Sequence, residues 1–532
     1  MRVSVSPLIP VLALAAACAT PPKPDGSGDR GTTGTSSVAA PAPAGEAEPV
    51  RDPAKARIKV FALSDFHGHL YPLEPANYGK YFGGIANIGG SMKTRDQFHA
   101  KNSLLLDNGD MWTGPSVSTF LRGEPVIAAY NALGMSAANV ANHEFDFGLD
   151  VLRTRAKEAR FPFLGANIVE AGTAKSPDFV RPYLIEERDG IKVGVIGLSY
   201  RDTPKTTLAK HVAGLEFKDY AETLARVIPE VKAAGAEVII VLFHDTMDAA
   251  QAIFEKHPEL AVHAVIAGQN HRKGAVMVGN TPILNPGPFG RSYGRFDIEV
   301  DRKSRAVTVA HEIVDVTGPI GAPSYPPLLA LEAIGESARQ KSKELEQTVL
   351  GKLKSPLPLG NFEESPLGHL VVDSWLAAFP EVDVAICNHG ALREPLGRGG
   401  VTLGAITSIL PFENNLYIVK LTGKQLKEQL AIDSPVVSGI TWRFQEKDGK
   451  RQILSVADRL GKPIDDKKTY RVVINDFMYD GGDGFTFKTA DPSPSDTGIS
   501  LREPIMRTFR LAEGAGREVD APVGPRAAKM RR

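Results

Sequence analysis

The chain has 532 residues, of which 42% are hydrophobic and 23% charged, proportions that are typical of a folded soluble protein of two or more domains. Its 62 Lys and Arg residues balance 62 Asp and Glu residues, so the overall charge gives no reason to expect a nucleic-acid polymer as partner. The two cysteines, Cys18 and Cys387, are too few for a disulfide scaffold or a multi-cysteine metal cluster. Any metal must therefore be bound by histidine, carboxylate or amide groups.

Residues 1–18 have the parts of an export signal: a positive start at Arg2, an apolar stretch over 8–17, and small residues before Cys18. The apolar stretch is about half the roughly 20 residues that a membrane-spanning helix needs. The pattern resembles a bacterial lipoprotein signal peptide, in which the cysteine is lipidated after cleavage. We therefore expect an exported protein that faces the periplasm or the cell surface and meets the membrane only through a lipid on Cys18. Plain secretion is the alternative.

The segments near both ends are poor in large apolar side chains. Residues 19–56 consist mainly of Pro, Gly, Ser, Thr and Ala, a composition that cannot bury enough surface to fold. They are predicted to form a disordered linker. Residues 513–532 are polar with a basic end and are predicted to be a disordered tail.

Between residues 57 and 320, short apolar runs alternate with amphipathic stretches, which indicates strands buried on both faces and hence an α/β sandwich. Five of the six runs reach Asp, Asn or His at their ends. In open α/β sheets ligands bind at the carboxyl ends of the strands, so these side chains are expected to converge on one crevice. The runs are 58–65, 103–110, 137–144, 192–199, 237–245 and 263–271.

The residues at these strand ends offer carboxylate, imidazole and amide groups. This mixture is expected for Zn, Mn or Fe(II) rather than for calcium. A single Asp-x-His is more often a hydrogen-bonded turn than a metal site, but blocks in this order at consecutive strand ends predict a metal centre. The candidates are Asp65, His67, Asp110, Asn142, His143, His244, Gln269 and His271.

This ordered set resembles the calcineurin-like metallophosphoesterases and, over the whole chain, the bacterial 5'-nucleotidase, UDP-sugar hydrolase and 2',3'-cyclic phosphodiesterase family. The resemblance implies a four-layer α/β/β/α sandwich with a second α/β domain, and two divalent ions. In the family pattern Asp65, His67, Asp110 and His271 would hold one ion, and Asp110, Asn142, His244 and Gln269 the other. The family usually has histidine at the position of Gln269, so the second ion is expected to bind more weakly or to be a harder metal than zinc.

The resemblance also implies the chemistry of the site. Two cations roughly 3.5–4 Å apart would lower the pKa of a bridging water, giving a hydroxide that attacks phosphorus. His143 and Asp146 match the catalytic pair of the family, and His143 would stabilise an oxygen of the phosphate ester on the opposite side. The alternative for His143 is a capping or core histidine. Glu144 is expected to have a structural role.

The second half of the chain has its own pattern. A run with helical spacing predicts a linker helix within residues 321–350, which separates a metallophosphoesterase domain (57–320) from a substrate-binding domain (351–512). In the latter domain, strands are predicted at 382–390, 415–423, 438–444 and 470–476. The string KTYRVVINDFMYDGGDGFTF (468–487) is the most specific part of the resemblance to the C-terminal domain of 5'-nucleotidases.

The resemblance assigns the recognition of a nucleotide to this domain: two aromatic rings that sandwich the base, a carboxylate for the ribose hydroxyls, an amide that contacts base or sugar, and an arginine for the phosphate. The alternatives are core aromatics and a surface ion pair of the arginine with Glu394 or a nearby residue. A second family arginine is replaced by Asn361, which weakens the case for a terminal monophosphate as substrate. The matching residues are Phe412 and Phe477, Asp483, Asn388 and Arg393.

These observations predict a metal-dependent phosphoric ester hydrolase that acts on nucleotides in the manner of a 5'-nucleotidase and belongs to nucleotide catabolism. A 2',3'-cyclic nucleotide phosphodiesterase or a nucleotide-sugar hydrolase is the alternative among enzymes. A catalytically impaired nucleotide-binding surface lipoprotein is the alternative outside enzymes, motivated by Gln269 and Asn361. The expected partners are a nucleotide or a related phosphate ester and two divalent ions such as Zn or Mn, and the oligomeric state is left open.

Overall fold

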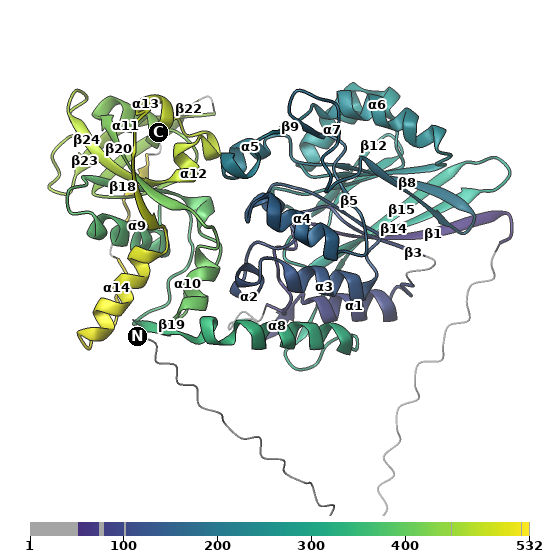
Figure 1. The fold of residues 1–532 in the computed structure, drawn as a ribbon, viewed down its shortest axis with the longest axis horizontal. Helices are drawn as coiled ribbons and strands as arrows, with labels where there is room; N and C mark the ends of the chain where they lie inside the picture. The colour runs from purple at the N-terminus through teal and green to yellow at the C-terminus, as the bar shows by residue number, and fades with distance from the viewer. Residues whose placement is uncertain (1–51, 74–78, 100–102, 448, 523, 531–532) are drawn as a thin grey trace, which may run out of the picture. The chain divides into compact units, whose positions relative to one another are not determined.

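The computed structural model describes residues 52–73, 79–99, 103–447, 449–522 and 524–530 (Figure 1). The predicted signal peptide, Cys18 and almost all of the predicted linker lie outside these residues. The first strand begins at Lys55, two residues inside the segment that was predicted to be linker. Among the described helices, none is long and apolar enough to cross a membrane.

Two six-stranded sheets form the centre of the first half of the chain. In the first sheet four strands run parallel, and β14 and β15 add an antiparallel edge. Its order is β15-β14-β1-β3-β4-β5, with β1 (Lys55–Leu63), β3 (Ser103–Asp107), β4 (Ala137–Asn139), β5 (Phe163–Leu164), β14 (Ser292–Asp301) and β15 (Val307–Asp315).

The second sheet has a parallel centre and an antiparallel strand at each edge. All six apolar runs of the sequence contain a strand of one of the two sheets, as predicted. The order of the second sheet is β12-β13-β11-β10-β8-β7, with β7 (Tyr183–Arg188), β8 (Ile191–Leu198), β10 (Val238–Phe243), β11 (Ala264–Ala267), β12 (Gly274–Val278) and β13 (Thr281–Asn285).

The two sheets pack face to face, and helices cover their outer faces (Figure 1). Side chains such as Val60 and Ile240 are fully buried between the sheets. Removing such side chains from water is the main stabilising term of the domain. The helices are α1 (Ile85–Thr94), α3 (Glu124–Leu133) and α4 (Leu149–Glu158) on the first sheet, and α6 (Tyr220–Ala233) and α7 (Met247–Lys256) on the second. This order of layers is the predicted α/β/β/α sandwich.

Short elements complete this half of the chain. Two small antiparallel pairs lie outside the main sheets. These elements are β2 (Lys80–Phe82) with β16 (Thr317–Pro319), β6 (Ile168–Glu170) with β9 (Leu215–Phe217), the helices α2 (Ser116–Phe120) and α5 (Thr203–Thr206), and the 3-10 turns η1 (His143–Phe145), η2 (Ala209–His211) and η3 (Pro258–Leu260).

Helix α8 (Leu329–Gln347) lies within the segment that was predicted to be the linker helix. It starts after Pro326 and Pro327, buries Leu331 and Ala338, and exposes most of its other side chains. It packs against α3 of the first half of the chain and against α10 (Leu403–Ile409) of the second half. The helix is therefore held by both halves of the chain.

A five-stranded sheet with helices on both faces forms the second half. All four predicted strands are present, three of them in this sheet and the fourth in the small sheet beside it. The sheet order is β21-β18-β24-β20-β25, with β18 (Val384–Asn388), β20 (Asn415–Thr422), β21 (Pro435–Ser438), β24 (Thr469–Asn475) and β25 (Ser495–Ser500). The helices are α9 (Pro366–Ala378), α10, α11 (Gly423–Leu430), α12 (Asp476–Tyr479), α13 (Phe487–Ala490) and α14 (Glu503–Gly514), with β17 (Val349–Leu353), β19 (Gly399–Thr402) and the turns η4 (His389–Ala391) and η5 (Gly482–Gly484) between them.

The prediction of a disordered tail over residues 513–532 is wrong for its described part. The backbone NH of Val519 donates to the carbonyl of Lys352 at 2.8 Å, and β26 (Ala527–Lys529) joins β22 (Ile440–Lys447) and β23 (Lys450–Asp458) in a three-stranded sheet. Val519 and Ala527 are both buried. Composition missed this segment because two isolated apolar side chains and backbone pairing hold an otherwise polar stretch in place.

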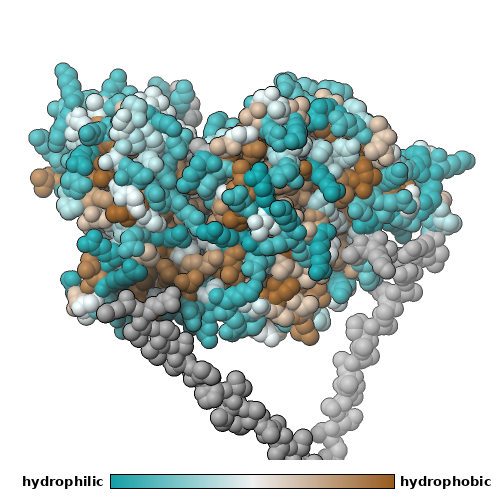
Figure 2. All heavy atoms as spheres, viewed as in Figure 1, coloured by the Kyte–Doolittle hydropathy of each residue, from teal (hydrophilic) through white to brown (hydrophobic). Residues whose placement is uncertain are grey.

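The surface is mainly polar, as expected for a folded soluble protein. On the face drawn in Figure 2, hydrophilic side chains dominate and apolar residues form smaller patches between them.

Candidate metal centre and substrate cavity

Five candidate ligands follow directly on strands whose carboxyl ends meet at one edge of the two packed sheets. Asp65, Asp110 and Asn142 follow β1, β3 and β4 of the first sheet, and His244 and Gln269 follow β10 and β11 of the second. Within each sheet these strands run parallel to one another, so their carboxyl ends lie side by side. The topology therefore brings together residues that are about two hundred positions apart in sequence.

The backbone at this edge is held in an unusual conformation. Five candidate ligands have a positive φ although none is glycine, a conformation that is costly and concentrates at functional sites. They are Asp65 (φ 52°), His67 (47°), Asp110 (58°), Gln269 (65°) and His271 (57°). Gly268 is required for a different reason: a Cβ at this position would lie 2.4 Å from Ser64 Oγ and 3.0 Å from Asp65 Oδ2.

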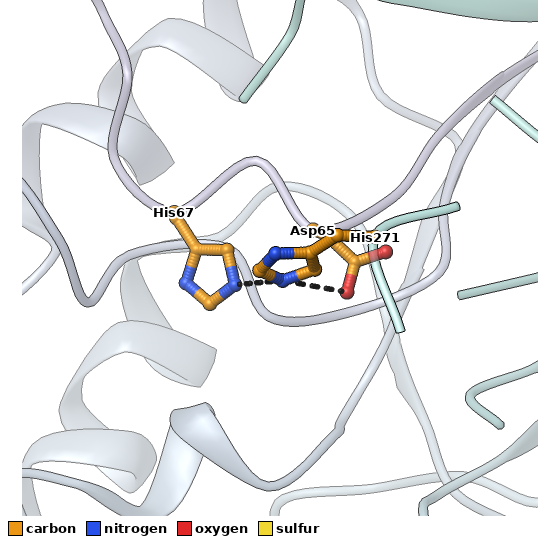
Figure 3. Close-up of side chains that lie close together, drawn as sticks. All are labelled: Asp65, His67 and His271. Atoms are coloured by element: carbon orange, nitrogen blue, oxygen red, sulfur yellow. Dashed lines mark hydrogen bonds and ion pairs between the residues drawn. The ribbon is translucent and has the colours of Figure 1, made fainter. Parts of the chain in front are cut away.

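A first cluster joins Asp65, His67 and His271 (Figure 3). The Nε2 atoms of His67 and His271 lie 3.1 Å apart, and His271 Nε2 lies 3.7 Å from Asp65 Oδ1. His67 Nδ1 lies 2.8 Å from the carbonyl oxygen of Thr113, which fixes the proton on that nitrogen and leaves a lone pair on Nε2. Burial and the positive charge of Arg393 lower the pKa of His271 to about 3, so both imidazoles are neutral, as metal ligands must be.

A second cluster joins Asp65, Asp110 and His244, with ligand atoms that all lie within 4.8 Å of one another. His244 Nε2 is 3.2 Å from Asp110 Oδ2 and 3.9 Å from Asp65 Oδ1, while its Nδ1 donates to the carbonyl of Asn108 at 2.7 Å. Asp110 Oδ2 is also 3.9 Å from His67 Nε2, so Asp110 stands between the two clusters. This is the place that the sequence resemblance assigned to a bridging ligand.

The electrostatics of the second cluster favour a bound cation. Asp65 and Asp110 are 0% and 1% exposed, and burial raises the pKa of Asp65 to about 6. Burial opposes a charged imidazole, but the adjacent Asp110 carboxylate raises the pKa of His244 to about 10. In the chain alone a proton on His244 therefore compensates the carboxylates, a role that a divalent cation would take over.

The remaining donor atoms fit a metal ion. Asn142 Oδ1 and Gln269 Oε1 are buried and have no hydrogen-bond partner among the described residues. Buried polar atoms are rarely left unpaired, and each of these two oxygens carries lone pairs. Carboxylate, imidazole and amide groups together suit a divalent transition metal.

His143 and Asp146 form the predicted pair beside this centre. His143 Nδ1 lies 2.7 Å from Asp146 Oδ2, and His143 Nε2 lies 4.0 Å from Asp110 Oδ2. Burial opposes the charged form, yet Asp146 raises the pKa of His143 above its ordinary value. His143 is therefore an oriented imidazole whose free nitrogen lies beside the metal centre, and not a capping residue.

Glu144 has the structural role that the sequence analysis assigned to it. Its carboxylate accepts hydrogen bonds from the backbone NH groups of Asp110 at 3.1 Å, Met111 at 2.7 Å and Ala141 at 2.7 Å. These bonds tie the segment after β3 to the segment after β4, which keeps Asp110 and Asn142 in register.

One cavity joins the metal centre to the second half of the chain. All five residues that were predicted to bind substrate line it, together with four of the residues that were predicted for the metal centre and its catalytic pair. They are Asn388, Arg393, Phe412, Phe477 and Asp483 from the second half, and Asn142, His143, Asp146 and Gln269 from the first.

Arg393 makes the closest contact across this cavity. Its Nη2 lies 3.0 Å from His143 Nε2, and its guanidinium lies over the ring of Phe412, 5.5 Å from the centroid. The Phe412 ring in turn stacks on His143, with centroids 5.8 Å apart and planes inclined by 23°. Glu394 points elsewhere, to His69 Nε2 at 3.3 Å, so the alternative of an Arg393–Glu394 surface pair is wrong.

Asn388 and Asp483 form a hydrogen-bonded chain at another part of the cavity. Asn388 Nδ2 donates to Asp483 Oδ2 at 2.7 Å, and Asn388 Oδ1 accepts from Asn475 at 3.0 Å. Asp483 has a positive φ of 53° within η5, and burial raises its pKa to about 6. Asn388 thus orients the Asp483 carboxylate, a role that the sequence alone did not indicate.

Asn361, which replaces a family arginine, takes no part in the cavity. It is exposed, and its Oδ1 accepts from the backbone NH of Glu364 at 2.9 Å. Among the described residues that line the cavity, Arg393 is the one arginine.

Phe289 also lies at the site, although the sequence analysis missed it. Its ring is 5.2 Å from that of His271 and 5.8 Å from that of His67, and its backbone NH donates to the Asp65 carbonyl at 2.8 Å. The residue follows a turn after β13 and carries no local sequence signal for this position.

Comparisons with known proteins agree with this geometry. Residues 348–489 match the family model described as "5'-nucleotidase, C-terminal domain". The chain is 27% identical to the cell wall protein Lmo0130 of Listeria monocytogenes over 85% of its own length and 66% of that protein. It is 26% identical to the protein UshA of Yersinia enterocolitica over 85% of its own length and 90% of that protein. The chain thus spans slightly less than two thirds of Lmo0130.

The solved structures give the same result. The 5'-nucleotidase precursor from Thermus thermophilus matches with a TM-score of 0.77 and 25% identity, covering 90% of this chain and all of that one. The fold is therefore that of the two-domain 5'-nucleotidases, and the donor set could hold divalent metal ions. The match over residues 348–489 and the likeness to a 5'-nucleotidase precursor over 90% of the chain confirm the resemblance predicted from the sequence motifs.

The position of Asp110 between both clusters leads to a first prediction. Asp110→Ala should strip bound metal from the purified protein, because the substitution removes an anionic ligand of the second cluster that also lies 3.9 Å from His67 of the first. Elemental analysis of metal-loaded protein after desalting measures this loss, and Asp110→Asn repeats the test with the shape of the side chain preserved. Asp96→Asn alters a buried carboxylate outside the site and should retain its metal. Normal metal content in both Asp110 variants would contradict the assignment.

The unpaired amide oxygen of Gln269 leads to a second prediction. Gln269→His should raise the zinc affinity of the metal position that contains residue 269 by about 10-fold or more, because imidazole is a better zinc ligand than a neutral amide. Gln269→Ala should lower the zinc affinity of the same position. Calorimetric titration of chelator-treated protein with zinc measures both. Unchanged binding in the two variants would mean that Gln269 does not reach the metal.

Proposed function

We propose that this protein is a metal-dependent phosphoric ester hydrolase that hydrolyses nucleotides. The observation that carries the proposal is the contact of Arg393 Nη2 with His143 Nε2 at 3.0 Å, in a cavity that also contains the base- and sugar-binding candidates. A phosphate group at this point would meet the metal centre on one side and its nucleoside would meet Phe412, Phe477 and Asp483 on the other.

Two divalent ions would be held at the metal centre. Asp65, His67, Asp110 and His271 would hold one, and Asp110, Asn142, His244 and Gln269 the other. When bound, the ions would supply an activated water and charge compensation for the phosphoryl oxygens.

His143 and Arg393 would act on the phosphate itself. Asp146 holds Nδ1 of His143, so the imidazole presents Nε2 to the substrate and can donate a hydrogen bond or a proton to an ester oxygen there. The planar guanidinium of Arg393 offers parallel donors to phosphate oxygens. A bound phosphate would lie between these two groups and replace their present contact.

The nucleoside would be held by residues of the second half. Phe412 and Phe477 are only partly buried and line the same cavity, as residues that stack on a base must. Asp483, oriented by Asn388, would accept hydrogen bonds from ribose hydroxyls.

The exposed position of Asn361 favours a second candidate within the same chemistry. With Arg393 as the one arginine among the described cavity residues, a terminal monophosphate has fewer partners, so a 2',3'-cyclic nucleotide or a nucleotide sugar is the alternative substrate. A nucleotide-binding protein without turnover is the alternative outside enzymes, and the amide of Gln269 motivates it.

A substrate panel tests the proposal. Phosphate release is measured from AMP, 2',3'-cyclic AMP, UDP-glucose and p-nitrophenyl phosphate, each with Mn, Zn and Co. Hydrolysis of a nucleotide that requires added metal supports the proposal, and the preferred substrate decides between the enzyme candidates. Nucleotide binding without any turnover would overturn it in favour of a binding protein.

We further propose that the protein is an exported lipoprotein, with a signal peptide over 1–18, lipidation at Cys18, a linker over 19–56, a metallophosphoesterase domain over 57–320, a linker helix within 321–350, and a substrate-binding domain from 351. The sequence pattern around Cys18 supports the anchor.

The role of His143 gives a third prediction. His143→Ala should slow phosphate release by about 10²–10⁴-fold, the range for a positioned acid–base group, while metal content stays near normal. Turnover and elemental analysis on the same preparation measure both, with His257→Ala as a control on a partly exposed histidine far along the chain. Loss of metal in parallel with activity would make His143 a ligand instead.

The role of Phe477 gives a fourth prediction. Phe477→Ala should lower kcat/KM for the preferred nucleotide by about 5–150-fold, because stacking of a base on an aromatic ring contributes roughly 1–3 kcal/mol. Turnover of p-nitrophenyl phosphate should change little. Phe362→Ala removes a comparable, partly buried ring outside the cavity and should leave both substrates unaffected. Equal loss on both substrates in Phe477→Ala would identify it as a core residue.

A further inference from the structure

A segment of the metal-bearing half also reaches the nucleoside end of the cavity. Helix α5 contacts η5, the turn that carries Asp483. The residues at the end of α5 and after it, Thr206, Thr207 and Leu208, line the same cavity as Phe412 and Phe477. None of these three was singled out by the sequence analysis.

Thr207 is notable within this segment because its hydroxyl is both buried and unpaired. The residue is 5% exposed, and its Oγ1 has no hydrogen-bond partner in the described part of the chain. Its backbone is extended, and its NH donates to the carbonyl of Thr203 at 3.1 Å. An unpaired buried hydroxyl destabilises a fold, so its presence on a cavity wall points to a partner that arrives with the ligand.

The segment is also tied to the catalytic turn. The backbone NH of His211 in η2 donates to the carbonyl of Leu208 at 2.8 Å. The His211 ring lies 3.7 Å from the position that a Cβ on Gly148, two residues after Asp146, would occupy. Thr207 is therefore placed relative to His143 and Asp146 by local contacts.

We propose that Thr207 contacts the substrate, with its hydroxyl hydrogen-bonded to the nucleoside part of the bound nucleotide. This inference rests on the proposed function, because it requires that the cavity binds nucleotides. A hydroxyl both donates and accepts, so a sugar hydroxyl and a polar edge of the base are equivalent partners for it. The metal-bearing half would then contact the nucleoside as well as the phosphate, and Thr207 would contribute to substrate selection.

The experiment measures AMP binding to chelator-treated protein by calorimetry, which does not depend on turnover. Thr207→Val removes the hydroxyl with little change in shape and should weaken AMP binding about 3–10-fold, the loss expected for one neutral hydrogen bond. Thr207→Ser restores the hydroxyl and should bind AMP nearly as tightly as wild type. The melting temperature of Thr207→Val should equal or exceed that of wild type, since the variant removes an unpaired polar group.

Thr407 offers a matched control. It is 1% exposed, its Oγ1 is also unpaired among the described residues, and it lies in α10 outside the set that lines the cavity. Thr407→Val should therefore leave AMP binding unchanged. Ribose 5-phosphate separates the two partners: weaker binding of both ligands by Thr207→Val assigns the contact to the sugar, and weaker binding of AMP alone assigns it to the base.

The outcomes separate this inference from the proposed function. If wild type binds AMP and Thr207→Val binds it equally well, the inference is overturned while the proposed function stands. The same holds if Thr207→Val and Thr407→Val weaken binding to the same extent. If wild-type protein binds no AMP in either the chelator-treated or the metal-loaded form, the nucleotide-binding function is overturned, and the role of Thr207 with it.

Discussion

The site depends on the burial of two carboxylates, Asp65 and Asp110, at the end of the packed sheets. Their ligand atoms lie within 4.8 Å of one another and of His244, where water cannot screen their charge. A buried pair of this kind is stable only beside a positive charge. The neutral imidazoles, the unpaired amide oxygens and the left-handed backbone around the pair are all arranged for such a charge, at the cost of local strain. Burial of apolar side chains in the packed sheets and helices offsets this cost.

Arg393 extends the same electrostatic arrangement to the second half of the chain. It is partly buried, and its charge interacts with the carboxylates of Asp110, Asp146 and Asp483, so one guanidinium serves the metal centre and the sugar-binding candidate together. Its stacking on Phe412, which in turn stacks on His143, joins these three side chains into one surface. Under the proposed function, this continuity would let a phosphate ester and its nucleoside bind in a single cavity.

The parts of this arrangement that the sequence could predict are those encoded locally. The six strands were found because runs such as 237–245 have an apolar centre, here residues 238–243, and their ligands meet because parallel strands finish at one edge. Thr207, Phe289 and the orienting role of Asn388 were missed because each depends on a contact made by packing of distant segments. The ordered part of the tail was missed for the same reason: Val519 and Ala527 are single anchors in a polar stretch.

Direct measurement of metal binding by the wild-type chain tests this account most sharply. Chelator-treated protein is titrated calorimetrically with manganese or zinc, and thermal unfolding is followed before and after loading. We expect two ions per chain and a higher melting temperature in the loaded protein, because ions that bind only the folded state stabilise it. A chain that binds no divalent ion, or binds ions without any gain in melting temperature, would show that the buried carboxylates are compensated in another way.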